Sequence, residues 1–203
     1  MSSDDELLDA WAQGDTHAGH ELIERHFDRL FRFFEASVPG HAEDLVQDTL
    51  KACLEHPRRF RGENSFRAFV FGIARNKALM FWRSHAQRGP HVDVAALSIE
   101  DMGAGPSASL AQSQEERLLL EGLRQIPIDA QILLQLHYWE SLPGPALAHV
   151  LEIPEGTVRS RLRRAKELLA ARMESLASED LWKATADDLD RWAARVKKTS
   201  DRA

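Results

Sequence analysis

The stretch that decides the fold is residues 155–166, Glu-Gly-Thr-Val-Arg-Ser-Arg-Leu-Arg-Arg-Ala-Lys. Apolar side chains recur here at steps of four, three and four residues, which is the spacing of a single apolar stripe on an α-helix. The stripe consists of Val158, Leu162, Ala165 and Leu169. The opposite side carries Ser160, Arg163 and Arg164, flanked by Arg159 and Lys166. The sequence therefore predicts a helix over residues 155–173 with one buried face and one cationic face.

A shorter helix is expected just before it, over residues 144–151, and the turn Glu152-Ile153-Pro154 separates the two. Two helices joined by a turn of three or four residues have the proportions of a helix-turn-helix, whose second helix enters the DNA major groove. Arginine can bond bidentately to guanine in that groove, and backbone amides near Thr157 can meet a phosphate. Turn, stripe and cationic face together predict DNA binding. The arginines alone would equally suit a solvated helix face.

Helical spacing also dominates the rest of the chain, and no segment shows the convincing alternation of a strand. Pro39-Gly40, Pro57 and Pro127 mark helix boundaries. The expected helices cover residues 20–36, 42–55, 66–85, 112–126 and 129–139, with Asp129 as the N-cap of the last. In the first of them Phe27 and Phe31 belong to the apolar stripe, and in the third Met80 is expected to face inward.

Residues 89–111 change in composition to glycine, proline, serine and alanine, which is typical of a linker. At some 23 residues the segment exceeds the usual connection of about 4 to 6. Its low apolar content suits a segment that is ordered only when bound. The predicted fold class is therefore all-α, with two small helical domains joined by a flexible linker and the helix-turn-helix in the second.

Charge is strongly segregated along the chain, although the net charge is −6. Residues 1–24 hold seven acidic side chains and no Lys or Arg. Residues 58–88 hold eight basic side chains and one acid, and residues 155–172 hold six basic side chains and two acids. Two cationic blocks in an acidic chain indicate two places that meet phosphate.

Several classes of protein are excluded or disfavoured by composition. No apolar run approaches the roughly 18 residues of a membrane span, and the acidic N-terminus lacks the features of a signal peptide. The single cysteine, Cys53, rules out an internal disulfide framework and fits a reducing cytoplasm. The sequence contains no nucleophile, phosphate-loop or paired-carboxylate motif, so we do not expect an enzyme. We expect no cofactor and no metal site, either at His17, His20 and His26 or at Cys53 and His56.

Three further stretches of sequence, together with residues 155–166, carry a resemblance to a known family. They are Ala42-Glu43-Asp44-Leu45-Val46-Gln47-Asp48, then Arg59-Phe60-Arg61-Gly62 leading to Phe66, then Ile73-Ala74-Arg75-Asn76. In order and spacing, over roughly residues 20–175, they resemble the extracytoplasmic-function (ECF) group of bacterial sigma factors. The resemblance implies a sigma region 2 domain over residues 1–88, a linker over 89–111, a region 4 domain over 112–175 and a C-terminal helical extension over 176–203.

The resemblance implies a factor that binds RNA polymerase core and directs it to promoters. Docking on the clamp helices of the largest polymerase subunit would fall to Asp44, Gln47, Asp48 and Lys51. Minus-ten DNA would be bound and melted by Arg61, Gly62, Asn64, Ser65, Arg75, Asn76, Lys77 and Arg83, and minus-thirty-five DNA by Thr157, Arg159, Ser160, Arg163 and Arg164. An anti-sigma factor is a further implied partner.

Holding an extruded base calls for amide groups and cations, and a stacking face from Trp82 or Phe81 would assist. A position in the core is the competing prediction for Phe81. The chain also departs from the family: Glu152 stands where a glycine is usual, and Pro143 and Pro145 begin the first helix of the pair. These departures bear on the helix-turn-helix geometry.

Two readings compete with a sigma factor. One is a standalone helix-turn-helix regulator acting as a dimer, and the other is a protein-interaction module whose basic faces are merely solvated. In the C-terminal extension, a heptad-like stripe predicts a helix that docks on the second domain or contacts a regulator or polymerase. It consists of Trp182, Thr185, Leu189, Trp192 and Val196.

Overall fold

The computed structural model describes residues 2–55, 66–85, 93–102 and 114–176. Within these ranges the chain is helical, without any strand and with one isolated bridge between Ser98 and Pro127. The elements are α1 (Asp4–Ala12), α2 (Thr16–Ser37), α3 (Ala42–Glu55), α4 (Phe66–His85), η2 (Val94–Ala96), α5 (Gln114–Arg124), α6 (Ile128–Tyr138), α7 (Gly144–Leu151) and α8 (Glu155–Leu176). The all-α prediction is confirmed. No helix in the described ranges is long and apolar enough to cross a membrane.

Helix α1 is an element that the sequence analysis missed. Ser3 and Glu6 form a capping box, in which each side chain accepts a hydrogen bond from the other residue's backbone amide. Leu7 and Leu8 are buried, and Trp11 lies so close to Gly19 that a side chain at that position would collide with the indole ring. Glycine therefore permits the close approach of α1 to α2.

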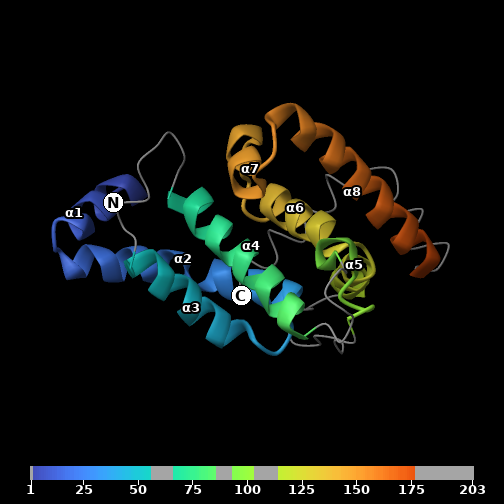
Figure 1. Cartoon of the computed structure of the whole chain (residues 1–203), viewed down its shortest axis with the longest axis horizontal. Helices are drawn as coiled ribbons and strands as arrows, with labels where there is room; N and C mark the ends of the chain where they lie inside the picture. The colour runs from blue at the N-terminus through green and yellow to red at the C-terminus, as the bar shows by residue number, and fades with distance from the viewer. Residues whose placement is uncertain (1, 56–65, 86–92, 103–113, 177–203) are drawn as a thin grey trace.

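The first four helices form a packed unit in which α2 contacts α1, α3 and α4. Helix α2 ends before Pro39 and Gly40, and Gly40 has a φ of 80°, which glycine adopts without strain. The Trp82 indole donates a hydrogen bond of 2.9 Å to the backbone carbonyl of Ser37, which ties α4 to the end of α2. In Figure 1, α4 runs between α3 on one side and α7 on the other.

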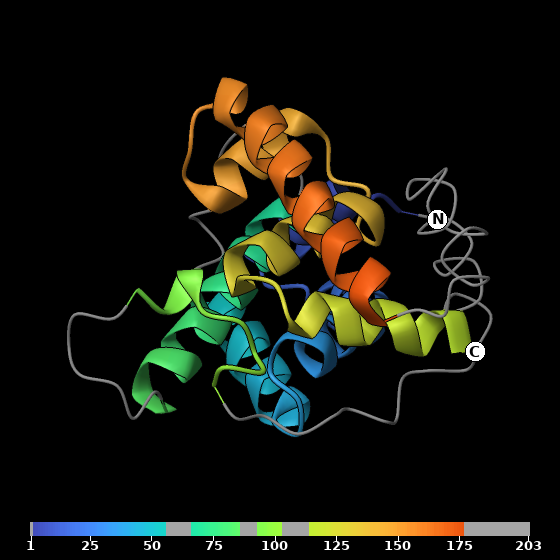
Figure 2. The ribbon, with the colours of Figure 1, turned by 90° about the vertical axis from the view of Figure 1, so that its right-hand side faces the viewer.

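Helices α5 to α8 form the second half of the molecule. Helix α8 crosses α6 and reaches α5 near its C-terminal end, as Figure 2 shows. Leu119, Leu123 and Ile126 meet Leu169 and Met173 in a core of their own. Gly122 belongs to this contact, because a side chain there would lie within 3.0 Å of Met173.

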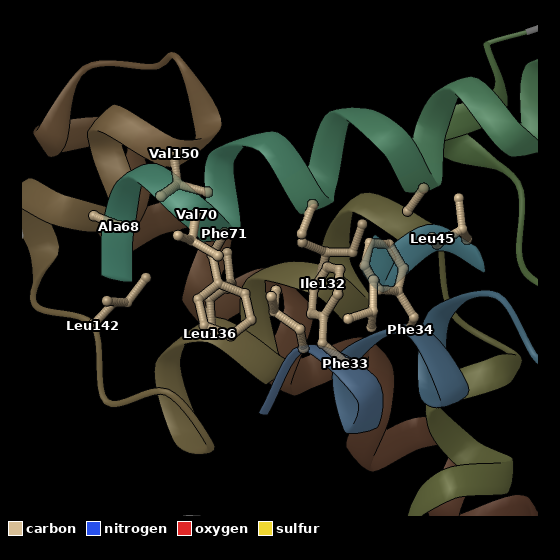
Figure 3. Close-up of a cluster of buried hydrophobic side chains, with 14 of the residues drawn as sticks. Phe33, Phe34, Leu45, Ala68, Val70, Phe71, Ile132, Leu136, Leu142 and Val150 are labelled. Carbon is tan, nitrogen blue, oxygen red and sulfur yellow. The ribbon is translucent and has the colours of Figure 1, made fainter. Parts of the chain in front are cut away.

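A larger hydrophobic core is shared by both halves. Side chains of α2, α3 and α4 join those of α6 and α7 in one continuous cluster, drawn in Figure 3. Phe71 of α4, Leu136 of α6 and Val150 of α7 are all buried in it. Two stretches that the sequence separates by a linker therefore pack directly on one another.

Part of the predicted linker is packed too. Val94 and Ile99 are buried, and the backbone amide of Ile128 donates to the carbonyl of Leu97 over 2.9 Å. Residues 93–102 thus lie against α6 without any partner, which differs from the expectation that the linker is ordered only when bound. A few well-placed apolar side chains are enough to anchor a segment that is otherwise rich in small residues.

Candidate nucleic-acid interface

The turn between α7 and α8 has helix-turn-helix geometry. Helix α7 ends at Leu151, and its C-cap residue Glu152 adopts a left-handed conformation with φ 55° and ψ 42°. The amide of Ile153 donates to the carbonyl of Ala148 over 3.1 Å, which closes the helix end. Pro143 and Pro145 lie at the N-cap and in the first turn, where a missing amide proton leaves no helix bond unmade. The glutamate therefore takes the conformation that a glycine would supply, and the prolines do not disturb the helix.

Helix α8 has the two faces that its sequence predicts. Val158, Ala165 and Leu169 are buried and Leu162 is half-buried. The residues expected to read DNA are exposed on the other side, namely Arg159, Ser160, Arg163 and Arg164, while Thr157 is half-buried.

The two central arginines of α8 are available to a ligand. The side chains of Arg163 and Arg164 are 82% and 70% exposed. Each lies 3.7 Å from a carboxylate oxygen of Glu167, a distance at which an exposed ion pair contributes little. Lys166, at the edge of this face, lies over the Tyr138 ring at 5.3 Å. The face therefore presents cations that a phosphate or a guanine edge could bind.

The expected DNA-binding residues of helix α4 are less uniformly exposed than those of α8. Asn76 and Arg83 are exposed, and the Lys77 ammonium reaches solvent beside Asp48, 3.6 Å from its carboxylate. Arg75 is only 13% exposed, because its guanidinium donates to Asp129 of α6 over 2.8 Å. The other candidates for this element, Arg61, Gly62, Asn64 and Ser65, lie outside the described residues.

Trp82 and Phe81, the two alternatives for a stacking face near the end of α4, differ in burial. Trp82, predicted as a stacking surface, is buried and hydrogen-bonded. Phe81, for which a core position was the competing prediction, is half-buried and stacks on His85 with the ring centroids 3.9 Å apart. Met80, predicted to face inward, is 61% exposed. A phase error of one residue near the end of a 20-residue helix accounts for Met80 and Trp82.

Helix α3 presents a polar face to solvent. Asp44, Gln47, Asp48 and Lys51 are exposed and spaced by three, one and three residues, so they share one side of the helix. Leu45, Val46 and Leu50 hold the other side in the core. The four candidates for polymerase docking are thus brought together.

The contact of Asp129 with both α4 and α8 is a feature that sequence reasoning missed. Asp129 is not the N-cap of α6, because the helix begins at Ile128 with Pro127 as its cap. Its two carboxylate oxygens accept from Arg75 of α4 at 2.8 Å and from Arg161 of α8 at 3.1 Å. One carboxylate therefore joins the two helices that carry the DNA-binding candidates. Partners 54 and 32 residues away leave no local signal in the sequence.

A groove of about 510 Å³ lies between α4 and the helix-turn-helix. It is lined from α4 by Phe69, Ile73 and Asn76, among others, and from the helix-turn-helix by His149 and Glu152. The expected minus-ten helix and the helix-turn-helix therefore face each other.

The remaining cysteine and histidine candidates differ in burial. Cys53 is buried, and burial raises the pKa of its thiol to about 12. No group of three or more metal-ligating side chains occurs among the described residues. His17 and His20 are exposed on the first turns of α2, which begins earlier than predicted.

Two family models match the chain in order. Residues 22–88 match Sigma-70 region 2, and residues 116–169 match Sigma-70, region 4. The chain belongs to the sigma-70 family. The helix-turn-helix and the exposed face of α8 lie in region 4, and α3 and α4 lie in region 2.

Curated relatives narrow the group within the family. The chain is 26% identical to the ECF RNA polymerase sigma-E factor of Haemophilus influenzae, covering 86% of this chain and 97% of the relative. It is 28% identical to the sigma-E factor of Escherichia coli K12, covering 86% and 96%. Among solved structures it is similar to CnrH in complex with the cytosolic domain of CnrY, with a TM-score of 0.66 and 22% identity over 87% of this chain and 100% of that one. The chain is thus a sigma factor of the ECF group, and the resemblance found in the sequence is confirmed.

Proposed function

We propose that this sigma factor loads RNA polymerase core onto promoters through three of its surfaces. The observation that carries the proposal is the exposed row of Arg159, Ser160, Arg163 and Arg164 on the second helix of a helix-turn-helix within region 4. Such a row has donors for guanine edges and phosphates, and its buried stripe fixes the direction in which the row points. We assign it to the minus-thirty-five element, with Thr157 near the helix N-terminus against a phosphate.

The second surface is the minus-ten reader. We assign to it the loop residues Arg61, Gly62, Asn64 and Ser65, together with Arg75, Asn76, Lys77 and Arg83 of α4. An extruded base needs an amide-lined pocket, and the single strand around it needs cations. Asn76, Lys77 and Arg83 support this role by their exposure or their reach to solvent. Phe81 replaces Trp82 as the accessible aromatic ring.

The third surface is the exposed face of α3. Asp44, Gln47, Asp48 and Lys51 carry few cations, which suits a protein partner better than DNA, and we assign them to the clamp helices of the largest polymerase subunit. A region 2 domain over 1–88, a linker over 89–111, a region 4 domain over 112–175 and an extension over 176–203 stay predictions. So do the absence of enzymatic activity and of cofactors, a cytoplasmic location, and an anti-sigma partner.

A standalone dimeric regulator is the weaker candidate. It needs only the helix-turn-helix, and it leaves the match of residues 22–88 to Sigma-70 region 2 without a role. The stripe in the C-terminal extension, from Trp182 to Val196, lies outside the described residues, and its role in docking or regulation stays open as predicted.

Reconstitution with polymerase core tests the proposal. The wild-type chain should co-purify with core and direct transcripts from defined start sites in a promoter library. Reversing two charges of the α3 face, in D44R/D48R, should weaken core binding at least about 10-fold, because like charges facing each other across an interface cost about 1.4 kcal/mol or more. Glu43→Arg reverses a neighbouring exposed charge outside the assigned set and should change core binding less than about twofold.

The outcomes separate the candidates. A chain that binds duplex DNA specifically but neither binds core nor supports initiation is a standalone regulator. Equal loss of core binding in D44R/D48R and E43R would contradict the assignment of the docking face, but it would leave the assignment as a sigma factor intact.

A further inference from the structure

The described arrangement cannot serve both promoter elements at once. Arg75 of the expected minus-ten helix and Arg161 of the expected minus-thirty-five helix contact the same carboxylate, at 2.8 and 3.1 Å. DNA elements centred about 10 and 35 base pairs before a start site are about 85 Å apart in B-form DNA, at 3.4 Å for each base pair. Helices α4 and α8 must therefore separate before both can bind.

We propose that Asp129 is a latch that holds this sigma factor closed by occupying cations of its two DNA-binding helices. The inference rests on the proposed function. A carboxylate within hydrogen-bond distance of a guanidinium competes with the phosphate or base that the same guanidinium would bind. Asp129 takes Arg75 directly out of the DNA-binding set, and it ties α8 to α4 through Arg161.

Two polar contacts join the halves beside the shared apolar core. Gln131 of α6 donates to the backbone carbonyl of Ala36 over 2.7 Å, and Glu140, just beyond α6, lies 3.5 Å from Arg29 of α2. Both are polar contacts made by groups that water can also satisfy once the halves separate.

Several buried polar atoms of α4 and α6 have no hydrogen-bond partner among the described residues. They are Nε of Arg75, Oε1 of Gln131 and Nε2 of Gln135. Buried polar groups in a permanent core are nearly always paired, and unpaired ones regain hydrogen bonds when exposed. The closed form thus combines an apolar contact at Phe71 and Leu136 with polar groups that favour opening.

The position of Asp129 makes the latch separable from DNA reading. It lies in the first turn of α6, outside the helix-turn-helix, and it carries a negative charge that DNA does not attract. Removing its charge should open the chain while leaving every assigned DNA-binding side chain in place.

Two measurements on the full chain test this. Cysteines replace the exposed Met80 of α4 and Ala171 of α8 and are labelled with a donor and an acceptor dye. Energy transfer between the dyes reports the separation of the two helices. Native Cys53 can stay, because it is buried and burial raises its pKa to about 12. In the unlabelled protein, binding of the free chain to a promoter duplex from the library is measured by anisotropy. The matched control is Glu121→Gln, which removes one exposed carboxylate from α5.

Asp129→Asn should lower energy transfer and tighten duplex binding by the free chain about 3- to 10-fold relative to Glu121→Gln, since the binding-competent fraction rises. Initiation by the D129N holoenzyme should match wild type. Equal energy transfer and equal duplex binding in D129N and E121Q would overturn the latch, while wild-type initiation would still stand. If wild type fails to initiate, the proposed function fails instead.

A second variant keeps the test decisive if D129N does not fold. Arg161→Gln breaks the pair from the α8 side, and Arg161 is outside the assigned DNA-binding set. It should lower energy transfer in the same direction, whereas unchanged transfer in a folded R161Q would count against the latch.

Discussion

Helices α4 and α8 carry cations of the same kind in opposite environments. On α8, Arg163 is 82% exposed and has only a distant carboxylate beside it. On α4, Arg75 is 13% exposed and donates to a half-buried carboxylate over 2.8 Å. The first arginine is ready for a ligand from outside the chain, and the second already has one within it.

The difference shows that a basic block in a sequence specifies charge and leaves the partner of that charge open. Both blocks look alike in composition, and both lie in segments that match sigma regions. Among the described residues, the contact of Arg75 with α6 distinguishes them. A cation that is paired within the chain contributes to its fold until the pair is broken, whereas an exposed cation contributes little to stability.

Substitution of the two arginines should separate these roles most clearly. Arg163→Ala should reduce minus-thirty-five-dependent initiation about 5- to 150-fold, because one bidentate contact to a base contributes about 1–3 kcal/mol. It should leave the melting temperature unchanged, since the side chain is exposed. Arg75→Ala should lower the free energy of unfolding by about 1–3 kcal/mol, because it leaves a half-buried carboxylate with one partner fewer. Run-off transcription and calorimetry measure the two effects.

Arg172→Ala is the matched control on α8. It removes an exposed cation from the same helix, nine residues beyond Arg163 and outside the assigned DNA-binding set. Initiation should change less than about twofold. If R163A destabilises the chain as much as R75A does, the contrast between the two helices is wrong.

The N-terminal end of α4 packs on His26 of α2, which is a buried ionisable residue. Its ring meets Phe66 edge-on with centroids 5.3 Å apart, and its Nε2 lies 2.7 Å from a carboxylate oxygen of Asp4. Its Nδ1 is buried without a partner among the described residues. Burial lowers the pKa of His26 below its usual 6.5, although Asp4 opposes this shift. The neutral ring donates to Asp4, and protonation would place a second N–H where no acceptor lies.

Acidification should therefore lower the free energy of unfolding of the chain. The unfolded chain takes up a proton at His26 near pH 6.5, and the folded chain takes it up only at lower pH, so the unfolded state binds more protons in that window. The stabilising contribution is complete above pH 6.5 and is lost as the pH falls through the folded pKa. Urea unfolding at pH 7.5 and 5.5 should show this loss.

His26→Gln tests the assignment, because an amide can still donate to Asp4 and does not titrate. The variant should lose less stability than wild type between the two pH values. His20→Gln, which removes an exposed histidine from the same helix, should keep the wild-type difference. Asp4 titrates in a separate range: burial alone would raise its pKa, but Arg25 and His26 hold it below 3.8.

Sequence reasoning located most helices because their ends have local causes. Helices α3, α4 and α7 have the predicted bounds, at positions set by nearby prolines and glycines. Helix α1 was missed, although its capping box at Ser3 and Glu6 can be found in the sequence, because its apolar residues are few. At Met80 and Trp82, an ideal helical period carried over many residues placed the side chains on the wrong sides.

The latch and the shared core could not be predicted in the same way. Asp129 resembles an N-cap in its local sequence, and its partners come from helices far along the chain. A 23-residue segment of small residues suggested separate domains, and composition does not reveal that Phe71 and Leu136 fill one core. Local patterns thus predicted the helices that carry the proposed DNA-binding residues, while the contact between these helices depends on tertiary packing.

The smallest effect should come from the turn that orients α8. Glu152 has a φ of 55°, and a side chain in this conformation costs about 1 kcal/mol. Glu152→Gly should remove that strain and raise the melting temperature by about 2–4 °C. Glu155→Gly places the same substitution in the right-handed first turn of α8 and should lower stability by about 0.5–1 kcal/mol. Because Glu152 already holds the turn in the left-handed form, the glycine should leave DNA affinity within about twofold of wild type. A large change in affinity would mean that α8 is oriented differently when it binds DNA.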